Sequence, residues 1–131
     1  SVKNGKLLVD EEKLLYPGDL LHEAGHIAVT PARFRNEIND EISLPELHPG
    51  VLETEAIMWS YAACVQLGLD PQIVFHPNGY LGNSEALLFN FKLGVFPGVN
   101  QLEDAGMTLS RQTAANSGAE PFPTMIKWLK D

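Results

Sequence analysis

The sequence predicts a mainly helical α+β fold in a single domain of 131 residues. Several apolar stretches have helical spacing and end at glycine or proline, which is typical of packed helices. One short apolar run near the N-terminus follows a turn pair, which indicates a strand or hairpin. Hydrophobic residues make up 44% of the chain and charged residues 20%, as in ordinary compact globular proteins.

The net charge of the chain and the length of its apolar runs argue against two classes of partner, nucleic acids and membranes. The formal net charge is −8. Nucleic acids and anionic membranes are themselves negatively charged and attract basic proteins, so they would repel an acidic chain. No apolar run approaches the roughly 20 residues of a membrane span, and the N-terminus shows no signal-peptide pattern. We therefore expect no nucleic-acid or membrane partner. The chain opens abruptly on Ser1-Val2-Lys3, as part of a longer protein would.

Cysteine usage indicates the compartment. Cys64 is the single cysteine, so no internal disulfide can form. This usage favours a reducing compartment, and we expect a cytoplasmic protein. The thiol lies in the longest apolar pattern, where we expect a small, unreactive core side chain.

The first predicted elements are a strand and a helix. The run 6–9 follows the turn pair Asn4-Gly5, which indicates a strand. The first helix is expected over about 17–29, with a proline and an aspartate near its start and Thr30-Pro31 as its stop. Gly25 lowers helix propensity there by roughly 1 kcal/mol. A glycine at this place suggests close approach of another backbone, or room beside a ligand.

A polar connector precedes the longest helical pattern. Residues 31–49 are charged and punctuated by prolines, which predicts a solvated loop or a short irregular helix. Residues 52–69 are apolar almost all round, which predicts the central buried helix. Glu53 and Glu55 occupy its first turn, where acids suit the helix dipole.

Shorter elements are expected towards the C-terminus. Residues 71–75 should form a helical turn or brief strand, and 76–80 a turn. A helix over 85–93 should pack through four side chains, Leu87, Leu88, Phe89 and Phe91. Proline and glycine breaks separate the last elements, namely a helix over 99–106, a helical turn over 110–116 and a closing amphipathic helix over 125–129.

Residues 19–29 carry the strongest functional signal. His22-Glu23-Ala24-Gly25-His26 is an H-E-x-x-H pattern, and positions i and i+4 of a helix stack on one face. Both imidazoles can then reach one metal ion at about 2.0–2.1 Å. Glu23 points beside that metal, where a general base must lie to touch a metal-bound water. The uncharged residues in the gaps favour a buried metal helix over a solvated surface helix.

A catalytic zinc usually keeps three protein ligands and one position for water. No third histidine follows His26 closely, and His48 lies in a proline-flanked loop. The glutamates at the head of the central helix are better candidates, because a buried helix gives a rigid platform. On this ground alone, Glu53 and Glu55 both remain open.

These residues resemble a known group. An H-E-x-x-H helix followed by an acid that opens a second buried helix is similar to the glutamate-type zincin metallopeptidases (gluzincins), and its short spacing resembles the ImmA/IrrE-type peptidases. Small bacterial zincin-like proteins are also similar over about half of the chain, from Tyr16 to Tyr80. The motifs that carry this likeness are Pro17-Gly18-Asp19-Leu20-Leu21-His22-Glu23-Ala24-Gly25-His26, Trp59-Ser60-Tyr61-Ala62-Ala63 and Phe75-His76-Pro77.

The resemblance implies a compact zincin-like domain with His22 and His26 as zinc ligands and Glu23 as the base. In gluzincins with an E-x-x-x-D pattern the first glutamate binds the metal, which aligns Glu53 with the third ligand. Ile57 stands where the supporting aspartate would be, a departure from the pattern. Glu55 is the competitor of Glu53.

Three further polar residues are candidates. His76 and Tyr80 share a turn, and either could donate a hydrogen bond to the oxyanion of a tetrahedral intermediate. Their plainer interpretation is a backbone-bonded turn histidine and a half-buried tyrosine. Asp19, one turn before His22, either orients that imidazole or only caps the helix.

The expected function is zinc-dependent hydrolysis of a peptide bond in a peptide or protein substrate. Zinc lowers the pKa of its water, and Glu23 takes the proton and later passes it to the leaving amine. The main alternative is a non-catalytic zincin scaffold that holds metal or a partner, for which the isoleucine at position 57 and the small size leave room. A third is a metal-free helical domain with structural histidines.

Overall fold

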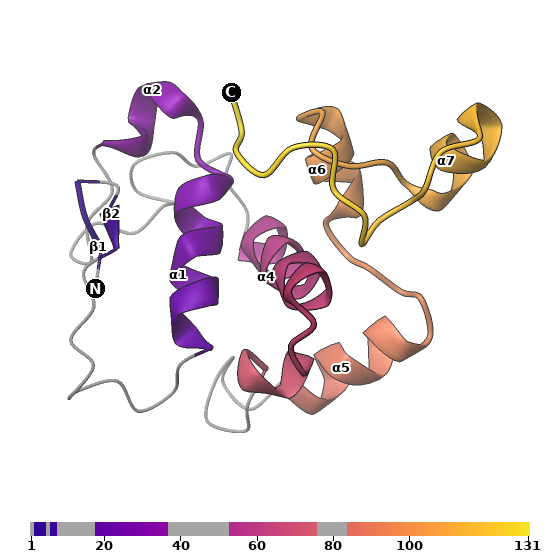
Figure 1. Ribbon diagram of the computed structural model, residues 1–131, viewed down its shortest axis with the longest axis horizontal. Helices are drawn as coiled ribbons and strands as arrows, with labels where there is room; N and C mark the ends of the chain where they lie inside the picture. The colour runs from indigo at the N-terminus through magenta and orange to yellow at the C-terminus, as the bar shows by residue number, and fades with distance from the viewer. Residues whose placement is uncertain (1, 5, 8–17, 37–52, 76–83) are drawn as a thin grey trace.

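The computed structural model describes residues 2–4, 6–7, 18–36, 53–75 and 84–131 (Figure 1). The described part is mainly helical. Helices α1 (Asp19–Ala28) and α2 (Ala32–Arg35) precede the longest helix, α4 (Glu53–Leu67). A short 3-10 turn, η1 (Pro71–Ile73), follows α4. The remaining helices are α5 (Ser84–Lys92), α6 (Val99–Asp104) and α7 (Arg111–Ser117).

Two very short strands form near the N-terminus, and the second of them contacts α1. β1 (Val2–Lys3) and β2 (Lys6–Leu7) pair antiparallel, with Val2 opposite Leu7. Residues 8 and 9 of the predicted strand lie outside the described residues. A pairing of this length does not test the predicted strand, so the β component of the α+β class stays a prediction.

Five helical elements were predicted where helices occur. The segments expected over 17–29, 52–69, 85–93, 99–106 and 110–116 correspond to α1, α4, α5, α6 and α7. Their start and stop residues are local signals, which explains why the bounds agree closely. Across the described ranges, no helix combines the length and apolar character that crossing a membrane requires.

Helix α4 lies at the centre, with α1 along one side and α5, α6 and α7 on the others (Figure 1). The contact with α1 is close because Gly25 has no side chain. A Cβ there would lie 2.9 Å from the carbonyl oxygen of Ala56 and 3.0 Å from Oγ of Ser60. The Ser60 hydroxyl in turn lies 3.2 Å from the Leu21 carbonyl oxygen and 2.8 Å from that of Ala56. The close backbone approach expected at Gly25 is confirmed.

The start of α1 is fixed by a second close approach. A Cβ on Gly18 would lie 2.0 Å from the carbonyl oxygen of Ile73, so only glycine lets the chain pass η1 at this place. The N-terminal end of α1, at Gly18, thus contacts the turn that follows α4. Gly25, later in α1, contacts the first turns of α4. The two helices therefore run antiparallel.

The core forms around the first three turns of α4. Ala56, Met58, Ala62 and Cys64 are fully buried there, as expected for the central helix. Its last turn leaves the core, since Leu67 is 61% exposed. The expectation that Phe89 packs inward from α5 is wrong, because its side chain is 62% exposed.

The predicted closing helix over 125–129 is wrong. The chain from residue 125 to 131 forms no helix and lies across other elements. The Trp128 carbonyl accepts a hydrogen bond from Nε1 of Trp59 at 2.8 Å, and the Lys130 N–H donates to the Ala28 carbonyl at 2.9 Å. A five-residue amphipathic window is too short to hold a helix alone, so these tertiary partners determine its conformation.

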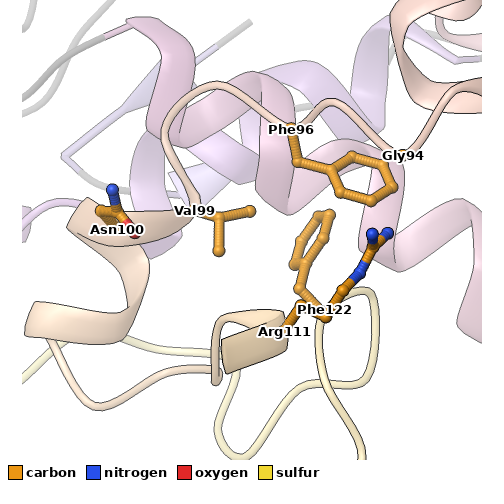
Figure 2. A pocket seen from close by; sticks show the side chains of 6 residues that line it. All are labelled: Gly94, Phe96, Val99, Asn100, Arg111 and Phe122. Carbon is orange, nitrogen blue, oxygen red and sulfur yellow. The ribbon is translucent and has the colours of Figure 1, made fainter. Parts of the chain in front are cut away.

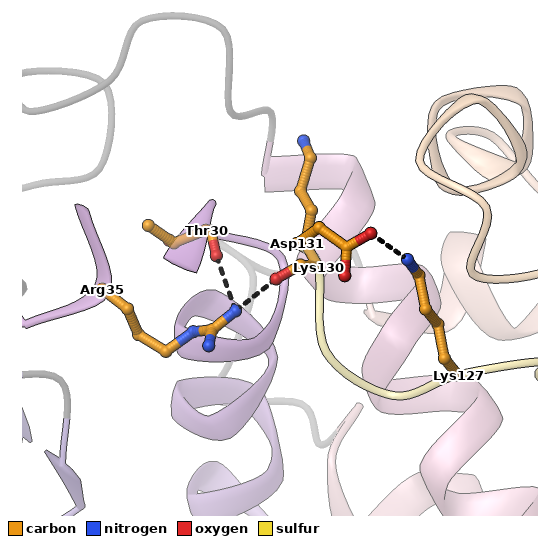
Figure 3. Close-up of polar contacts among 5 residues, drawn as sticks. All are labelled: Thr30, Arg35, Lys127, Lys130 and Asp131. Atoms are coloured by element: carbon orange, nitrogen blue, oxygen red, sulfur yellow. Dashed lines mark hydrogen bonds and ion pairs between the residues drawn. The ribbon is translucent and has the colours of Figure 1, made fainter. Parts of the chain in front are cut away.

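Arg35 fastens this C-terminal segment to the end of α1 (Figure 3). Its guanidinium donates to the carbonyl oxygens of Lys130 and, at 3.1 Å, of Thr30. Its Nε donates to the Ile27 carbonyl at 3.3 Å. The Ile27 carbonyl belongs to the last turn of α1, so this one side chain joins that turn, Thr30 and the C-terminal segment.

Candidate metal centre

His22 and His26 lie one turn apart on α1, with their ring nitrogens directed at each other. The two Nε2 atoms are 3.0 Å apart, and the ring planes cross at 82°. Both side chains are half-buried. Two nitrogen ligands of a tetrahedral zinc, each about 2.0–2.1 Å from the metal, lie about 3.3 Å apart. The observed separation is close to that value, so the pair fits a shared zinc ion.

The packing of α1 places both histidines beside the buried face of the helix. Leu21 and Gly25 lie against α4, and each is followed directly by a histidine. Successive residues are about 100° apart around a helix, so both imidazoles project from the edge of the interface. The Thr30 hydroxyl donates to the His26 carbonyl at 2.7 Å and the Ser60 hydroxyl contacts the Leu21 carbonyl. The backbone that carries the pair is therefore held from both ends.

Two arrangements of the imidazole tautomers are compatible with a 3.0 Å nitrogen pair. In one, a neutral imidazole donates its Nε2–H to the other ring. In the other, both Nε2 atoms direct lone pairs at a common cation and both protons reside on Nδ1. Neutral imidazole nitrogens are donors that zinc prefers, so the chemistry of the pair suits this metal as well as its geometry does.

Glu23 is half-buried and stands two positions after Leu21, so helical geometry directs it away from the contact of Leu21 with α4. At 3.6 residues per turn it lies roughly 60° around the helix from His26. The carboxylate is therefore outside the α1–α4 interface and on the same side as the second imidazole. This placement agrees with the role of base that the sequence predicts, and the role itself stays a prediction.

Glu55, the competitor for the third ligand position, is engaged elsewhere. Its side chain is only 4% exposed, and its Oε2 atom lies 3.8 Å from Nζ of Lys130. Burial raises the pKa of the Glu55 carboxyl, and the positive charge of Lys130 lowers it in part. The side chain lines a cavity of about 260 Å³ with Gln101, Asp104, Ala105 and Lys130. Glu55 thus faces α6 and the C-terminal segment.

Glu53 begins α4, and its side chain lies outside the described residues. One and two turns later on the same helical face come Ala56 and Ser60, which contact Gly25 and Leu21 of α1. The face of α4 that starts at Glu53 therefore continues along the histidine helix. Its role as third ligand stays a prediction.

The structure describes some of the remaining residues singled out in the sequence and not others. His76 and Tyr80 lie outside the described residues, as does the side chain of Asp19 at the start of α1. Ile57 is 8% exposed and belongs to the core. Cys64 is fully buried and carries a free thiol, as the sequence predicts.

Within the described ranges, no three His, Cys, Asp or Glu side chains lie close enough to hold a metal ion. The described part therefore contributes only the two histidines to the predicted zinc site, and the third ligand predicted for it, Glu53, has its side chain outside the described residues. Glu53, His76 and Tyr80 are not covered by this statement.

The sequence does not reveal the role of the C-terminal segment. Glu55 and Lys130 are far apart in the chain, and no spacing rule links them. Ser60 was more accessible to prediction, because a hydroxyl within an otherwise apolar helix indicates a buried hydrogen bond.

Comparison with known proteins found no similar protein. No family model matches the chain, and neither a curated protein nor a solved structure matches it. The likeness to gluzincins therefore rests on the motif residues of this sequence and on the geometry of the histidine pair.

Proposed function

We propose that this protein is a zinc-dependent metallopeptidase of gluzincin type, with His22, His26 and Glu53 as metal ligands. The observation that carries the proposal is the 3.0 Å separation of the two Nε2 atoms on one face of α1. The antiparallel contact of α1 with α4 supports it, because the histidines lie on one helix and Glu53 begins the other. An α+β zincin-like fold with an N-terminal strand or hairpin belongs to the same proposal.

The choice of Glu53 over Glu55 is supported by the neighbours of Glu55. Moving that carboxylate to a metal would separate it from Lys130 and leave the ammonium without its partner. Glu53 stands one turn before Ala56, whose carbonyl oxygen lies in the contact of α4 with α1.

When bound, zinc would polarise the substrate carbonyl and lower the pKa of the attacking water. His22 and His26 would hold the zinc through their Nε2 atoms. Glu23 accepts the proton of the attacking water and later donates it to the leaving amine. His76 or Tyr80 donates a hydrogen bond to the oxyanion in this scheme.

The proposal also includes a substrate class and a cellular compartment. Its substrate is a peptide or protein, and its compartment is the reducing cytoplasm. The buried thiol of Cys64, which has no second cysteine in the chain, is consistent with that compartment.

Glu23→Gln tests the catalytic part of the proposal. We expect zinc-loaded wild-type protein to cleave members of a diverse peptide library, and the variant to lose about 10²–10⁴-fold in rate while keeping its zinc. Glu120→Gln, an exposed substitution, is the matched control and should cleave at the wild-type rate. Turnover that survives in Glu23→Gln contradicts the assigned base.

A specific observation favours one second function, a non-catalytic zincin scaffold. Ile57 is buried in the core at the place where the resemblance expects a supporting aspartate. For a scaffold, zinc would bind to the wild-type protein but no peptide in the library would be cleaved. Zinc analysis beside the cleavage assay therefore separates the two functions.

A further inference from the structure

A second cavity, of about 260 Å³, lies between the α5–α6 connection, α6, α7 and the C-terminal segment (Figure 2). The residues that line it are Gly94, Phe96, Val99, Asn100, Arg111 and Phe122. Helix α4 lies between these elements and α1 (Figure 1). The cavity is therefore separate from the histidine pair, and a role for it does not depend on the proposed peptidase activity.

Aromatic and aliphatic side chains form the inner wall of this cavity. Phe122 is 5% exposed and Val99 is 8% exposed, so both belong to the core. The Phe96 ring meets the Phe122 ring edge to face, with centroids 5.0 Å apart. A planar or branched apolar group would be buried against these side chains without rearrangement of the core.

Arg111 supplies a positive charge at one side of the cavity. A Cβ on Gly94 would lie 2.7 Å from its Nη2 atom, so the absence of a side chain at Gly94 leaves room for the guanidinium. In the described part of the chain, no carboxylate forms an ion pair with Arg111. In a chain with a net charge of −8, this unpaired guanidinium is a local site of attraction for an anion.

The polar groups lie at opposite ends of the apolar wall. Figure 2 shows the Arg111 guanidinium on one side of the Phe122 ring and Asn100 on the other, beyond Val99. A guanidinium binds a carboxylate through two parallel hydrogen bonds. The Asn100 amide both donates and accepts, so it suits a neutral polar group at the far end of a ligand.

We propose that this cavity binds a small organic carboxylate with an apolar or aromatic body. Arg111 would take the carboxylate, and Phe96, Phe122 and Val99 would bury the body. The volume lies just below the roughly 300–1,000 Å³ of sites for drug-sized ligands. The ligand should therefore be about as large as one amino-acid residue, which a free organic acid or the C-terminal residue of a peptide would satisfy.

Binding of matched probes to the full chain tests the proposal. N-acetyl-L-phenylalanine and its neutral amide differ only in the carboxylate, and we expect the amide to bind at least about tenfold more weakly in NMR titrations. 3-Phenylpropionate lacks the acetylated amine. A preference for N-acetyl-L-phenylalanine over it indicates a peptide C-terminus as the source, and equal affinity indicates a simple organic acid. Equal binding of the acid and the amide, or no saturable binding at millimolar concentrations, overturns the proposal.

Two arginine variants locate the binding. Arg111→Gln should weaken binding of N-acetyl-L-phenylalanine by at least about tenfold. Arg33→Gln is the matched control, since Arg33 is exposed, lies 4.9 Å from the Phe34 ring centroid and is outside the cavity. It should bind as the wild type does. An equal loss of affinity in both variants would show that general charge, and not this cavity, attracts the ligand.

Discussion

Gly25 determines how closely the histidine helix approaches α4. Gly25→Ala would place a Cβ 2.9 Å from the Ala56 carbonyl oxygen, so the helices would have to move apart. We expect a loss of about 1–3 kcal/mol in the free energy of unfolding, typical of an overpacked interior, measured by urea denaturation.

Ala86→Gly is the control for this substitution, because Ala86 is exposed on α5. It isolates the intrinsic propensity difference of roughly 1 kcal/mol between the two residues in a helix. If Gly25→Ala stabilises the protein by as much as Ala86→Gly destabilises it, the close contact between α1 and α4 is contradicted.

Cys64 should be inert in the folded protein. Burial raises the pKa of its thiol, and the negative charge of Asp70 raises it further. A raised pKa leaves less of the reactive thiolate at any given pH below it, and burial also blocks access. We expect reaction with a thiol-directed disulfide reagent at pH 8 to follow global unfolding, whereas denatured protein reacts at once. Rapid modification of native protein would show that this face of α4 is open.

The histidine pair and Glu55 show what local sequence can and cannot predict at this scale. The approach of His22 to His26 follows from helical periodicity, which depends only on neighbours four residues apart. The partner of Glu55 is Lys130, which tertiary folding brings near. Local sequence therefore predicts the approach of the two histidines. The choice of Glu53 over Glu55 depends on the resemblance and on the helical face that Glu53 shares with Ser60, and it stays a prediction.

Among the helices too, features that depend on neighbouring residues were predictable, and those that depend on distant contacts were not. Five helical segments were predicted because their caps, breaks and apolar spacing are local signals. The segment over 125–129 has an amphipathic pattern, yet its backbone bonds to Trp59 and to the end of α1 instead of to itself. Sequence alone could not weigh those partners, because they come from elements far away in the chain.

Trp128→Ala tests the importance of the C-terminal segment. The Trp128 ring meets the Trp59 ring edge to face, with centroids 5.6 Å apart. Because Trp128 is only half-buried, we expect a loss of about 2–3 kcal/mol, at or below the low end for a large aromatic side chain, in urea denaturation. Leu129→Ala next to it is the control, since Leu129 is 54% exposed and should change stability by no more than about 0.5 kcal/mol. Equal effects would mean that the segment is not fixed by Trp128.

In the whole molecule, α4 organises two separate regions. One side holds the histidine helix, and the other holds the Phe96–Phe122 ring pair and the cavity beside Arg111 (Figure 1, Figure 2). Close contact of α1 with α4 through Gly25 and Ser60 gives the two histidines a fixed platform, which would lower the entropy lost on binding the proposed metal. Each proposed site can accordingly be tested without disturbing the other.

Zinc content per chain tests the central claim most directly. It is measured by elemental analysis after dialysis of wild type, His22→Ala, Glu53→Gln and Glu55→Gln. We predict about one zinc per chain in wild type and in Glu55→Gln, and a clear loss in His22→Ala and Glu53→Gln. Wild-type protein without zinc, or zinc retained when His22 or Glu53 is replaced, would contradict the proposed centre.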